Sequence, residues 1–357
     1  MPRWPPTLNA SPIFSENRLI CTSRARRSFS AELVSQLKSY GVARLSHHGV
    51  AIKTIKKLFK YHRRFFKLPL ADKLSVLHPG GESPARGFSP WAYEKTAVLR
   101  PDLHGHTGLS SAITSGRLPK ALLDAREQFA VGPPSDTEFP TPQLSDAILP
   151  GFNEATRQAY VEIADSCRLL VDVIDEGIGA HTGSISEATA GGQGAELNLN
   201  FYPEVERNVI NGDAHLERDS DVIMRRIWPH SDLGVVSALF PDRVGYTGLE
   251  ILVREPTGDK FVPLAIEEEG DMILLVADTL ERWTNGRVLA AVHRVGLPPV
   301  DTHLGNVSER RSAVMFFRPP PTADLGPLPC FLSADKPAKY EHITAEEYLK
   351  RYNKRLY

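Results

Sequence analysis

The feature that most constrains the fold is a change in the spacing of hydrophobic residues close to residue 196. Before this point, apolar residues recur at helical spacing and predict helices over residues 30–40, 52–68 and 154–177. After it, short apolar or alternating runs separated by turn residues predict strands over residues 197–202, 227–240, 249–253, 272–277, 288–295 and 312–318. Helices followed by strands argue against a parallel βαβ sheet, so we expect an α+β fold whose strands form a sandwich or a barrel.

Five further segments complete the predicted order of elements. Residues 1–27 are rich in proline and predict an extended arm, and residues 42–46 predict a short strand. Residues 79–153 are rich in glycine and proline, which is typical of a long, partly irregular excursion. A polar insertion over residues 204–226 interrupts the strands, and residues 345–351 predict a short closing helix.

The charge balance argues against two classes of partner. The 357 residues include 42 Lys and Arg against 43 Asp and Glu, so the formal net charge is −1. This balance supplies no field that would attract nucleic acid or an anionic membrane. No apolar run approaches the roughly 18 residues that span a bilayer. We therefore expect neither nucleic acid nor a membrane as a partner.

Cysteine usage and the N-terminus bear on the compartment. Cys21, Cys167 and Cys330 are widely scattered, so they predict neither a disulfide framework nor a cysteine-based zinc site. The N-terminus lacks the apolar stretch of a secretory signal, although its first 30 residues are rich in arginine and weakly resemble a mitochondrial transit segment. We expect a cytoplasmic protein, and the role of the arginine-rich segment as a targeting signal is left open.

Three side chains in the predicted strands could together bind a metal ion. His230 and Asp232 stand two residues apart on one predicted strand and therefore share a face, and His293 lies on another strand. Two imidazoles and one carboxylate can bind one face of iron(II) and leave the other positions open, although zinc accepts the same ligands. A rival pair, His215 and Glu217, lies in the polar insertion and is interpreted as part of a solvated loop.

A second group of residues could bind an anion. Arg310 and Ser312 share one face of a predicted strand, with Arg311 between them facing the other way. A guanidinium and a neighbouring hydroxyl suit a carboxylate, although a salt bridge at a strand edge would explain a single arginine equally well. Asn200 and Tyr202 form another same-face pair, in which the tyrosine alone would be interpreted as a core residue.

The order and spacing of several motifs identify a known family. Over about residues 30–355 the chain resembles the isopenicillin N synthase-like group of 2-oxoglutarate/iron(II)-dependent dioxygenases. The longest motif is residues 278–294, DTLERWTNGRVLAAVHR. The others are residues 46–50 (SHHGV), 63–69 (RRFFKLP), 86–89 (RGFS), 149–152 (LPGF), 200–203 (NFYP), 229–234 (PHSDLG) and 248–250 (GLE).

The resemblance implies a double-stranded β-helix, a jelly-roll relative of the cupins. It divides the chain into a mainly helical region with an arm and a long loop (1–195), a jelly-roll catalytic core (196–320) and a C-terminal extension (321–357), acting as one unit. By the same resemblance the iron ligands are His230, Asp232 and His293. The distal carboxylate of 2-oxoglutarate would be bound by Arg310, Ser312 and Tyr202, with Asn200 near the other end of the co-substrate.

The resemblance also implies an activity. The enzyme would use dioxygen and 2-oxoglutarate, release succinate and carbon dioxide, and hydroxylate, desaturate or cyclise a small molecule by attack on a C–H bond. Within this family, the sequence most resembles those of fungal enzymes that make specialised metabolites. The long excursion and the polar insertion would be lids, and the candidate substrate contacts are Arg86, Phe88 and Tyr93. The sequence alone identifies neither the substrate nor the oligomeric state.

The sequence departs from the family pattern and leaves alternatives open. Ser231 stands where threonine is commoner, and the 17-residue span from His293 to Arg310 is unusually long, so Arg311 is a second candidate for the carboxylate. An oxidase of the isopenicillin N synthase type would use the same arginine and serine to bind its substrate and would need no oxoacid. A non-catalytic jelly-roll binder is a further alternative. A zinc hydrolase is disfavoured because no His-Glu-x-x-His motif is present.

Overall fold

Two sheets dominate the fold of the chain. The structure is a computed structural model that describes residues 4–14, 23–103, 121–179, 184–190, 194–210, 222–256, 258–297 and 305–356. An eight-stranded sheet has the order β1-β2-β13-β10-β16-β6-β5-β3, and a four-stranded sheet has the order β12-β11-β14-β9. Two separate pairs are β15-β7 and β4-β8. Neighbours in the two large sheets run antiparallel, apart from β1 and β2. The strands are β1 Leu8–Asn9, β2 Val42–Ser46, β3 Gly87–Ser89, β4 Ala121–Asp124, β5 Glu127–Val131, β6 Glu196–Tyr202, β7 Val205–Glu206, β8 Val222–Arg225, β9 Ile227–His230, β10 Val236–Pro241, β11 Gly245–Val253, β12 Lys260–Ile266, β13 Met272–Val276, β14 His293–Val295, β15 Asn306–Val307 and β16 Arg310–Phe317.

Alternation along the strands explains how the two sheets stack. In β13, Met272, Leu274 and Val276 join a hydrophobic cluster shared with the helices, while Ile273 and Leu275 join a second cluster shared with the four-stranded sheet. The large sheet is therefore covered by helices on one face and by the small sheet on the other. This arrangement confirms the expected α+β sandwich.

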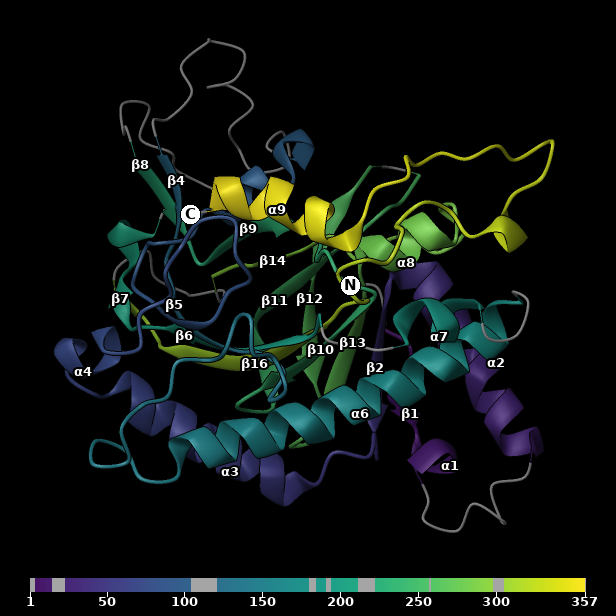
Figure 1. Cartoon of the computed structure of the whole chain (residues 1–357). Helices are drawn as coiled ribbons and strands as arrows, with labels where there is room; N and C mark the ends of the chain where they lie inside the picture. Colours follow the sequence, from purple (N-terminus) through teal and green to yellow (C-terminus); the bar gives the residue numbers. More distant parts are fainter. Residues whose placement is uncertain are drawn as a thin grey trace.

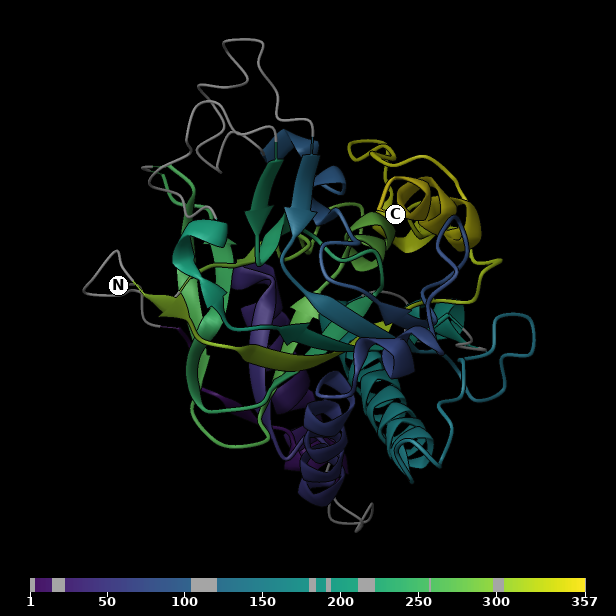
Figure 2. The same ribbon diagram turned by 90° about the vertical axis from the view of Figure 1, so that its left-hand side faces the viewer.

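The helices lie mainly on one side of the sandwich. Helices α3 and α6 run along the same side of the large sheet, and α9 lies on the opposite side of the molecule (Figures 1 and 2). No helix in the described part of the chain is long and apolar enough to cross a membrane. The helices are α1 Ser11–Phe14, α2 Ser23–Tyr40, α3 Ile52–Phe66, α4 Leu70–Leu74, α6 Phe152–Ile178, α7 Ser184–Thr189, α8 Asp278–Trp283 and α9 Ala345–Leu356, with 3-10 turns at η1 Thr96–Val98, η3 Arg207–Val209 and η4 Pro329–Phe331.

The helix predicted over residues 154–177 is confirmed as α6. Its apolar stripe is buried against the large sheet and α2, as the helical period requires. The helix ends at Gly179, whose φ of +75° is the left-handed conformation that favours glycine at this position. The buried stripe consists of Tyr160, Ile163, Ala164, Cys167, Leu170, Val171 and Ile174.

The predicted start of the first long helix is wrong. The helix α2 begins at Ser23 and not at residue 30. Instead, Ser30 lies inside the helix and donates its hydroxyl hydrogen to the carbonyl oxygen of Val173 at 2.8 Å. A Cβ on Gly177 would lie 2.4 Å from the Ser30 hydroxyl oxygen, so this glycine allows α2 and α6 to approach closely. A tertiary contact therefore explains both residues.

The strand predicted over residues 227–240 is two strands, β9 and β10. The backbone carbonyls of Asp232 and Gly234 accept hydrogen bonds from the N–H groups of Asp278 and Thr279 at the start of α8. These carbonyls therefore cannot continue a strand ladder, and the chain turns between His230 and Val236. The strand predicted over residues 288–295 is likewise shorter and comprises only β14.

The region 79–153 contributes more regular structure than the sequence predicted. Strands β5 and β3 extend the large sheet beyond β6, and β4 pairs with β8. Strand β12 and helix α8 also lie outside the predicted elements, and α9 extends five residues beyond the predicted closing helix, to Leu356. The short runs in these elements are too brief for periodicity to identify.

Candidate functional site

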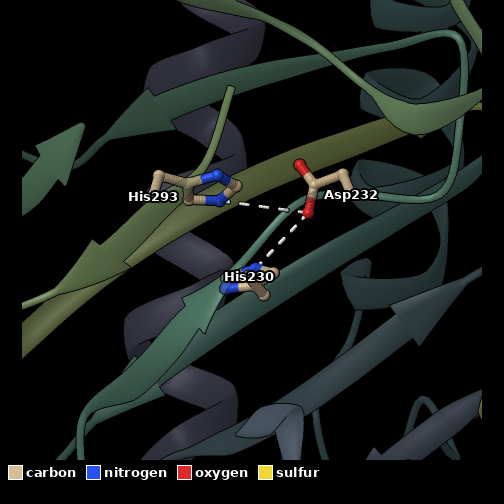
Figure 3. Close-up of side chains that lie close together, drawn as sticks. All are labelled: His230, Asp232 and His293. Carbon is tan, nitrogen blue, oxygen red and sulfur yellow. Dashed lines mark ion pairs between the residues drawn. The ribbon is translucent and has the colours of Figure 1, made fainter. Parts of the chain in front are cut away.

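The two histidines and the aspartate predicted to bind metal meet at one end of the small sheet. His230 ends β9 and His293 begins β14, and the two residues are paired directly across the antiparallel ladder. Asp232 lies in the turn after β9. Its Oδ1 is 3.4 Å from Nε2 of His230 and 3.9 Å from Nε2 of His293, as Figure 3 shows. All three side chains are buried, and their ligand atoms lie within 4.8 Å of one another.

Hydrogen bonds orient both imidazoles toward the aspartate. Nδ1 of His230 lies 2.8 Å from the carbonyl oxygen of Trp228, and Nδ1 of His293 lies 2.9 Å from that of Ala291. A carbonyl only accepts, so each neutral ring carries its proton on Nδ1 and presents the lone pair of Nε2 to Asp232. Three electron-pair donors thus converge on one point. This arrangement fits a cation among the three side chains.

The protonation states also fit a metal. Burial, followed by the charge of a protonated His230, lowers the pKa of His293 to about 4, so this imidazole is neutral at pH 7. Burial alone would raise the pKa of Asp232, but the neighbouring His293 and His230 outweigh it and hold that pKa below its ordinary value. A metal ion would meet a neutral His293 imidazole and an ionised Asp232 carboxylate, which are the states that coordinate it.

Helix α8 holds the turn that carries the aspartate. The N–H of Asp278 donates to the carbonyl oxygen of Asp232 at 2.7 Å, and the Thr279 hydroxyl donates to that of Leu233 at 2.8 Å. On the other side of the turn, Ser231 accepts a hydrogen bond from Nη1 of Arg100 at 3.3 Å. The side chain of Ser231 is therefore engaged away from the trio.

The predicted anion-binding residues lie on two neighbouring strands of the large sheet. Arg310 and Ser312 on β16 pair directly with Tyr202 and Asn200 on β6. Arg310 is only 1% exposed and its guanidinium carbon lies 4.8 Å from the centre of the Tyr202 ring. Nη1 of Arg310 donates to the Ser312 hydroxyl at 3.1 Å, while Nη2 has no partner among the described residues. The Tyr202 ring packs with Ile227 and Val295, which pair on the same two strands, β9 and β14, as His230 and His293, so Arg310 lies close to the trio.

Arg311 has a different environment from Arg310. Its side chain lies on the other face of β16, where it is buried beneath the helices and not directed to solvent. Its guanidinium donates to both carboxylate oxygens of Glu309, at 2.8 and 2.7 Å, and lies 5.0 Å from the centre of the Phe201 ring. The structure therefore brings Arg310, and not Arg311, together with Ser312 between the sheets.

A polar pocket beside the trio contains residues that the sequence reasoning missed. Arg126 donates from Nη1 to the side-chain oxygen of Asn200 at 3.0 Å and contacts Glu94 through Nη2. Gln128 also donates to Glu94, at 3.0 Å. Glu94, Arg126 and Gln128 line a small cavity together with His230 and Asp232. The sequence predicts that the segment containing these residues is irregular. The two-residue spacing of Arg126 and Gln128 was the one sequence feature that could have indicated this pocket.

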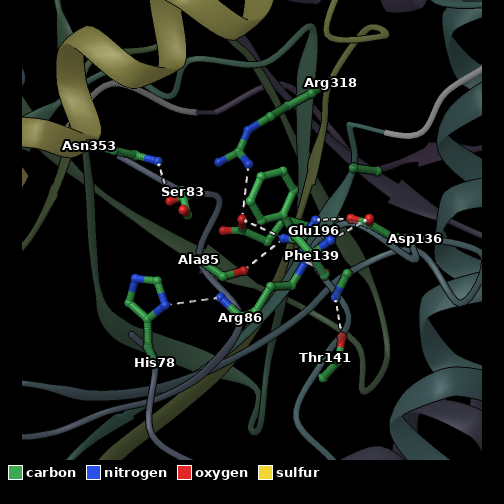
Figure 4. Close-up of polar contacts among 12 residues, drawn as sticks. His78, Ser83, Ala85, Arg86, Asp136, Phe139, Thr141, Glu196, Arg318 and Asn353 are labelled. Atoms are coloured by element: carbon green, nitrogen blue, oxygen red, sulfur yellow. Dashed lines mark hydrogen bonds and ion pairs between the residues drawn. The ribbon is translucent and has the colours of Figure 1, made fainter. Parts of the chain in front are cut away.

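A larger cavity of about 460 Å³ adjoins this pocket. The two cavities share Leu233 and Arg318 in their linings, and helix α9 forms part of the wall of each. Arg86 lines the larger cavity, where Glu196, Asp136 and the carbonyl oxygen of Phe139 engage its guanidinium (Figure 4).

Neither of the other two predicted substrate contacts lines these cavities. Phe88 is fully buried in the core, with its ring 6.0 Å from that of Phe65. Tyr93 is half-buried in the loop after β3. His215 and Glu217 belong to the stretch 211–221 of the polar insertion, which lies outside the described residues.

Comparisons with known proteins agree with this geometry. The family model "non-haem dioxygenase in morphine synthesis N-terminal" matches residues 11–147, and "2OG-Fe(II) oxygenase superfamily" matches residues 197–319. The 2-oxoglutarate-dependent dioxygenase imqE of Aspergillus flavus is 33% identical over 91% of this chain and 88% of its own length. The 2-oxoglutarate-dependent dioxygenase phqC of Penicillium fellutanum is 32% identical over 90% of this chain and 88% of its own length.

Solved structures agree on the fold. The full-length Neurospora crassa T7H in complex with alpha-KG superposes with a TM-score of 0.76 at 22% identity, covering 98% of this chain and 95% of that one. A putative 2OG-Fe(II) oxygenase family protein from Caulobacter crescentus gives a TM-score of 0.70 at 20% identity, covering 97% of each chain. The jelly-roll core expected from the sequence is thereby confirmed. The matched family models, the curated relatives and the converging His-Asp-His trio together establish that the chain belongs to the 2-oxoglutarate- and iron(II)-dependent oxygenase family, as a dioxygenase that uses iron(II), 2-oxoglutarate and dioxygen.

Proposed function

We propose that this dioxygenase binds iron(II) through His230, Asp232 and His293 and oxidises a C–H bond of a small molecule of fungal specialised metabolism. The single observation that carries the proposal is the convergence of these three buried donor groups, with both Nε2 lone pairs directed at one carboxylate. Its curated relatives include several fungal 2-oxoglutarate-dependent dioxygenases and a protein named proline hydroxylase buaE of Petromyces alliaceus. They support the substrate class.

Each part of the site has a separate task. The carbonyl oxygens of Trp228 and Ala291 fix the ring orientation of the two histidines, so the ligands need no rearrangement when metal binds. Arg310, Ser312 and Tyr202 hold the distal carboxylate of 2-oxoglutarate, and Asn200 lies near its other end. When bound, iron(II) and 2-oxoglutarate supply the activation of dioxygen, with succinate and carbon dioxide as by-products.

The substrate would enter from the larger cavity and reach the metal through the polar pocket. Leu233 and Arg318 stand where the two cavities adjoin, and Leu233 follows the metal-binding Asp232 directly. Glu94 and Arg126 would orient polar groups of the substrate. Of the residues predicted to contact substrate, Arg86 lines the larger cavity, while contacts by Phe88 and Tyr93 stay predictions.

Two further parts of the proposal concern the cell and not the site. We place the enzyme in the cytoplasm, because Cys167 and Cys330 are free thiols in the structure and free thiols suit a reducing compartment. Its near-zero net charge supports a small molecule as the partner in preference to nucleic acid or a membrane surface.

Anaerobic reconstitution tests the metal site directly. Addition of iron(II) and 2-oxoglutarate should produce the weak visible charge-transfer band of the metal chelate, and His230→Ala should abolish this band. His342→Ala is the matched control, because its side chain is 70% exposed and the substitution should leave the band unchanged. A band that persists in His230→Ala would refute the ligand assignment.

Dioxygen consumption separates the dioxygenase from an oxidase that needs no oxoacid. Uptake should depend on added 2-oxoglutarate and should be matched by release of succinate. Uptake that proceeds with substrate but without 2-oxoglutarate would favour the isopenicillin N synthase type of reaction. Absence of any uptake, despite a normal chelate band, would favour a binding protein.

A further inference from the structure

Two buried arginines flank one aromatic ring beside the metal trio. Arg310 is 1% exposed and Arg226, which lies between β8 and β9, is 3% exposed. The guanidinium carbons of Arg310 and Arg226 lie 4.8 Å and 6.0 Å from the centre of the Tyr202 ring. The sequence motifs single out Arg310, whereas Arg226 was assigned to the end of the polar insertion.

Both guanidiniums also meet the same irregularity in the small sheet. The register between β11 and β12 shifts between Tyr246 and Glu250. Within this bulge, the carbonyl oxygen of Thr247 accepts a hydrogen bond from Nε of Arg310 at 2.6 Å. A Cβ on Gly248 would lie 3.8 Å from Nη1 of Arg226, so the second guanidinium packs against the next residue of the bulge.

Within the part of the chain that the structure describes, these two arginines differ from most other buried arginines in lacking a carboxylate partner. Arg44, Arg86 and Arg311 each form an ion pair with Glu or Asp. Neither Arg226 nor Arg310 has a carboxylate within 4 Å in the described part of the chain. Asp242, which acts on Arg310 from a longer distance, forms its ion pair with Arg311.

Among the described residues, therefore, this buried positive charge has no compensating carboxylate in contact with it. Arg226 donates to the carbonyl oxygen of Ser308 through Nη2, while its Nε has no partner among the described residues. Burial, followed by the charge of Arg310, lowers the pKa of the Arg226 guanidinium to about 10. The charge of Arg243 lowers this pKa further, while Tyr202 and Tyr246 oppose the shift. A buried cation without a counter-ion is costly, so an anionic ligand would relieve the cost.

We propose that Arg226 is a second cationic contact for the distal carboxylate of 2-oxoglutarate and acts with Arg310 to make the site select a dicarboxylic oxoacid. The inference rests on the proposed function, because it requires 2-oxoglutarate to bind beside Arg310. The alternative role of Arg226 is structural: its bond to Ser308 would only hold the chain that enters β16.

Binding of two oxoacids to the iron(II)-loaded enzyme without dioxygen distinguishes these roles. The first is 2-oxoglutarate, and the second is 2-oxovalerate, in which a methyl group replaces the distal carboxylate. In Arg226→Gln the Kd of 2-oxoglutarate, followed by the chelate band, should rise about 10- to 100-fold, as expected for loss of a charge-assisted hydrogen bond. The Kd of 2-oxovalerate should stay within about threefold, because its tail makes no such bond.

Two more variants complete the test. Arg226→Lys keeps the charge but loses the planar fork, so its Kd for 2-oxoglutarate should lie between those of the wild type and Arg226→Gln. Should Arg226→Gln fail to fold, the lysine variant carries the same comparison between the two oxoacids. Arg243→Gln removes an equal but exposed charge nearby, and screening should keep its Kd for 2-oxoglutarate within about threefold.

Three results would overturn the inference. In the first, both Arg226 variants bind 2-oxoglutarate within about threefold of wild type. In the second, they lose affinity equally for both oxoacids, which would indicate the structural role. In the third, the wild-type enzyme binds iron(II) but forms no chelate with 2-oxoglutarate, and this result alone would also refute the proposed function.

Discussion

His62 should make the stability of the protein depend on pH in a way that can be calculated from its position. This side chain of α3 is fully buried, and its Nε2 lies 3.0 Å from the carbonyl oxygen of Asn200 on β6. Burial lowers the pKa of His62 to about 3; the bond to Asn200 opposes this shift and the charge of Arg311 adds to it. In the unfolded chain the pKa of histidine is about 6.5.

The sign follows from proton binding. Between about pH 6.5 and pH 3 the unfolded chain binds a proton at His62 that the folded protein does not, so stability falls as the pH falls. At about 1.4 kcal/mol per pKa unit, the free energy of unfolding should lose roughly 2 kcal/mol from this residue between pH 7.5 and pH 5.

Urea unfolding of the metal-free protein at both pH values would measure this loss. His62→Gln removes the titrating group, so the stability difference between wild type and variant should shrink by roughly 2 kcal/mol on acidification. His342→Gln, at an exposed position, should leave the wild-type dependence unchanged. A wild-type advantage over His62→Gln that stays constant within about 0.5 kcal/mol at the two pH values would contradict the reasoning.

Two other substitutions test the site and the packing. Arg310→Met should raise the Kd of 2-oxoglutarate by about 100-fold or more, whereas Arg311→Met, on the helix-covered face of β16, should leave it within about threefold; equal effects on the iron(II) chelate titration would refute the assignment. Gly177→Ala should destabilise the protein by about 1–3 kcal/mol in thermal unfolding, because the added methyl group meets the Ser30 hydroxyl at 2.4 Å, and an unchanged Tm would show that α2 moves away freely.

Local periodicity was sufficient to predict a helix or strand wherever the segment is long or one of its faces is buried throughout. The stripe of α6 predicts a helix because residues three and four apart share a face, and the structure buries that stripe. The alternation in β16 likewise places Arg310 and Ser312 on one face and Arg311 on the other. These relationships depend only on backbone geometry, so they also hold in the folded chain.

Short segments and unusual contacts depend on partners that are distant in sequence. Ser30 lies where the sequence predicted the first long helix to begin, but its hydroxyl donates to α6 from within α2. The break after His230 depends on hydrogen bonds from the start of α8, whose position periodicity does not predict. The segment that contains Arg126 looked irregular because β5 becomes a strand only by pairing with β6.

The sequence by itself determined the chemistry of the metal site, since the spacing of His230 and Asp232 and the motif around His293 identify the ligand types and their family. Only the tertiary structure decided which neighbours complete the site. Arg226 and Arg310 are 84 positions apart in the chain, yet the bulge in β11 and the ring of Tyr202 bring their charges together. Such a pairing depends on which strands of the two sheets face each other, and the local alternation of residues does not encode that choice.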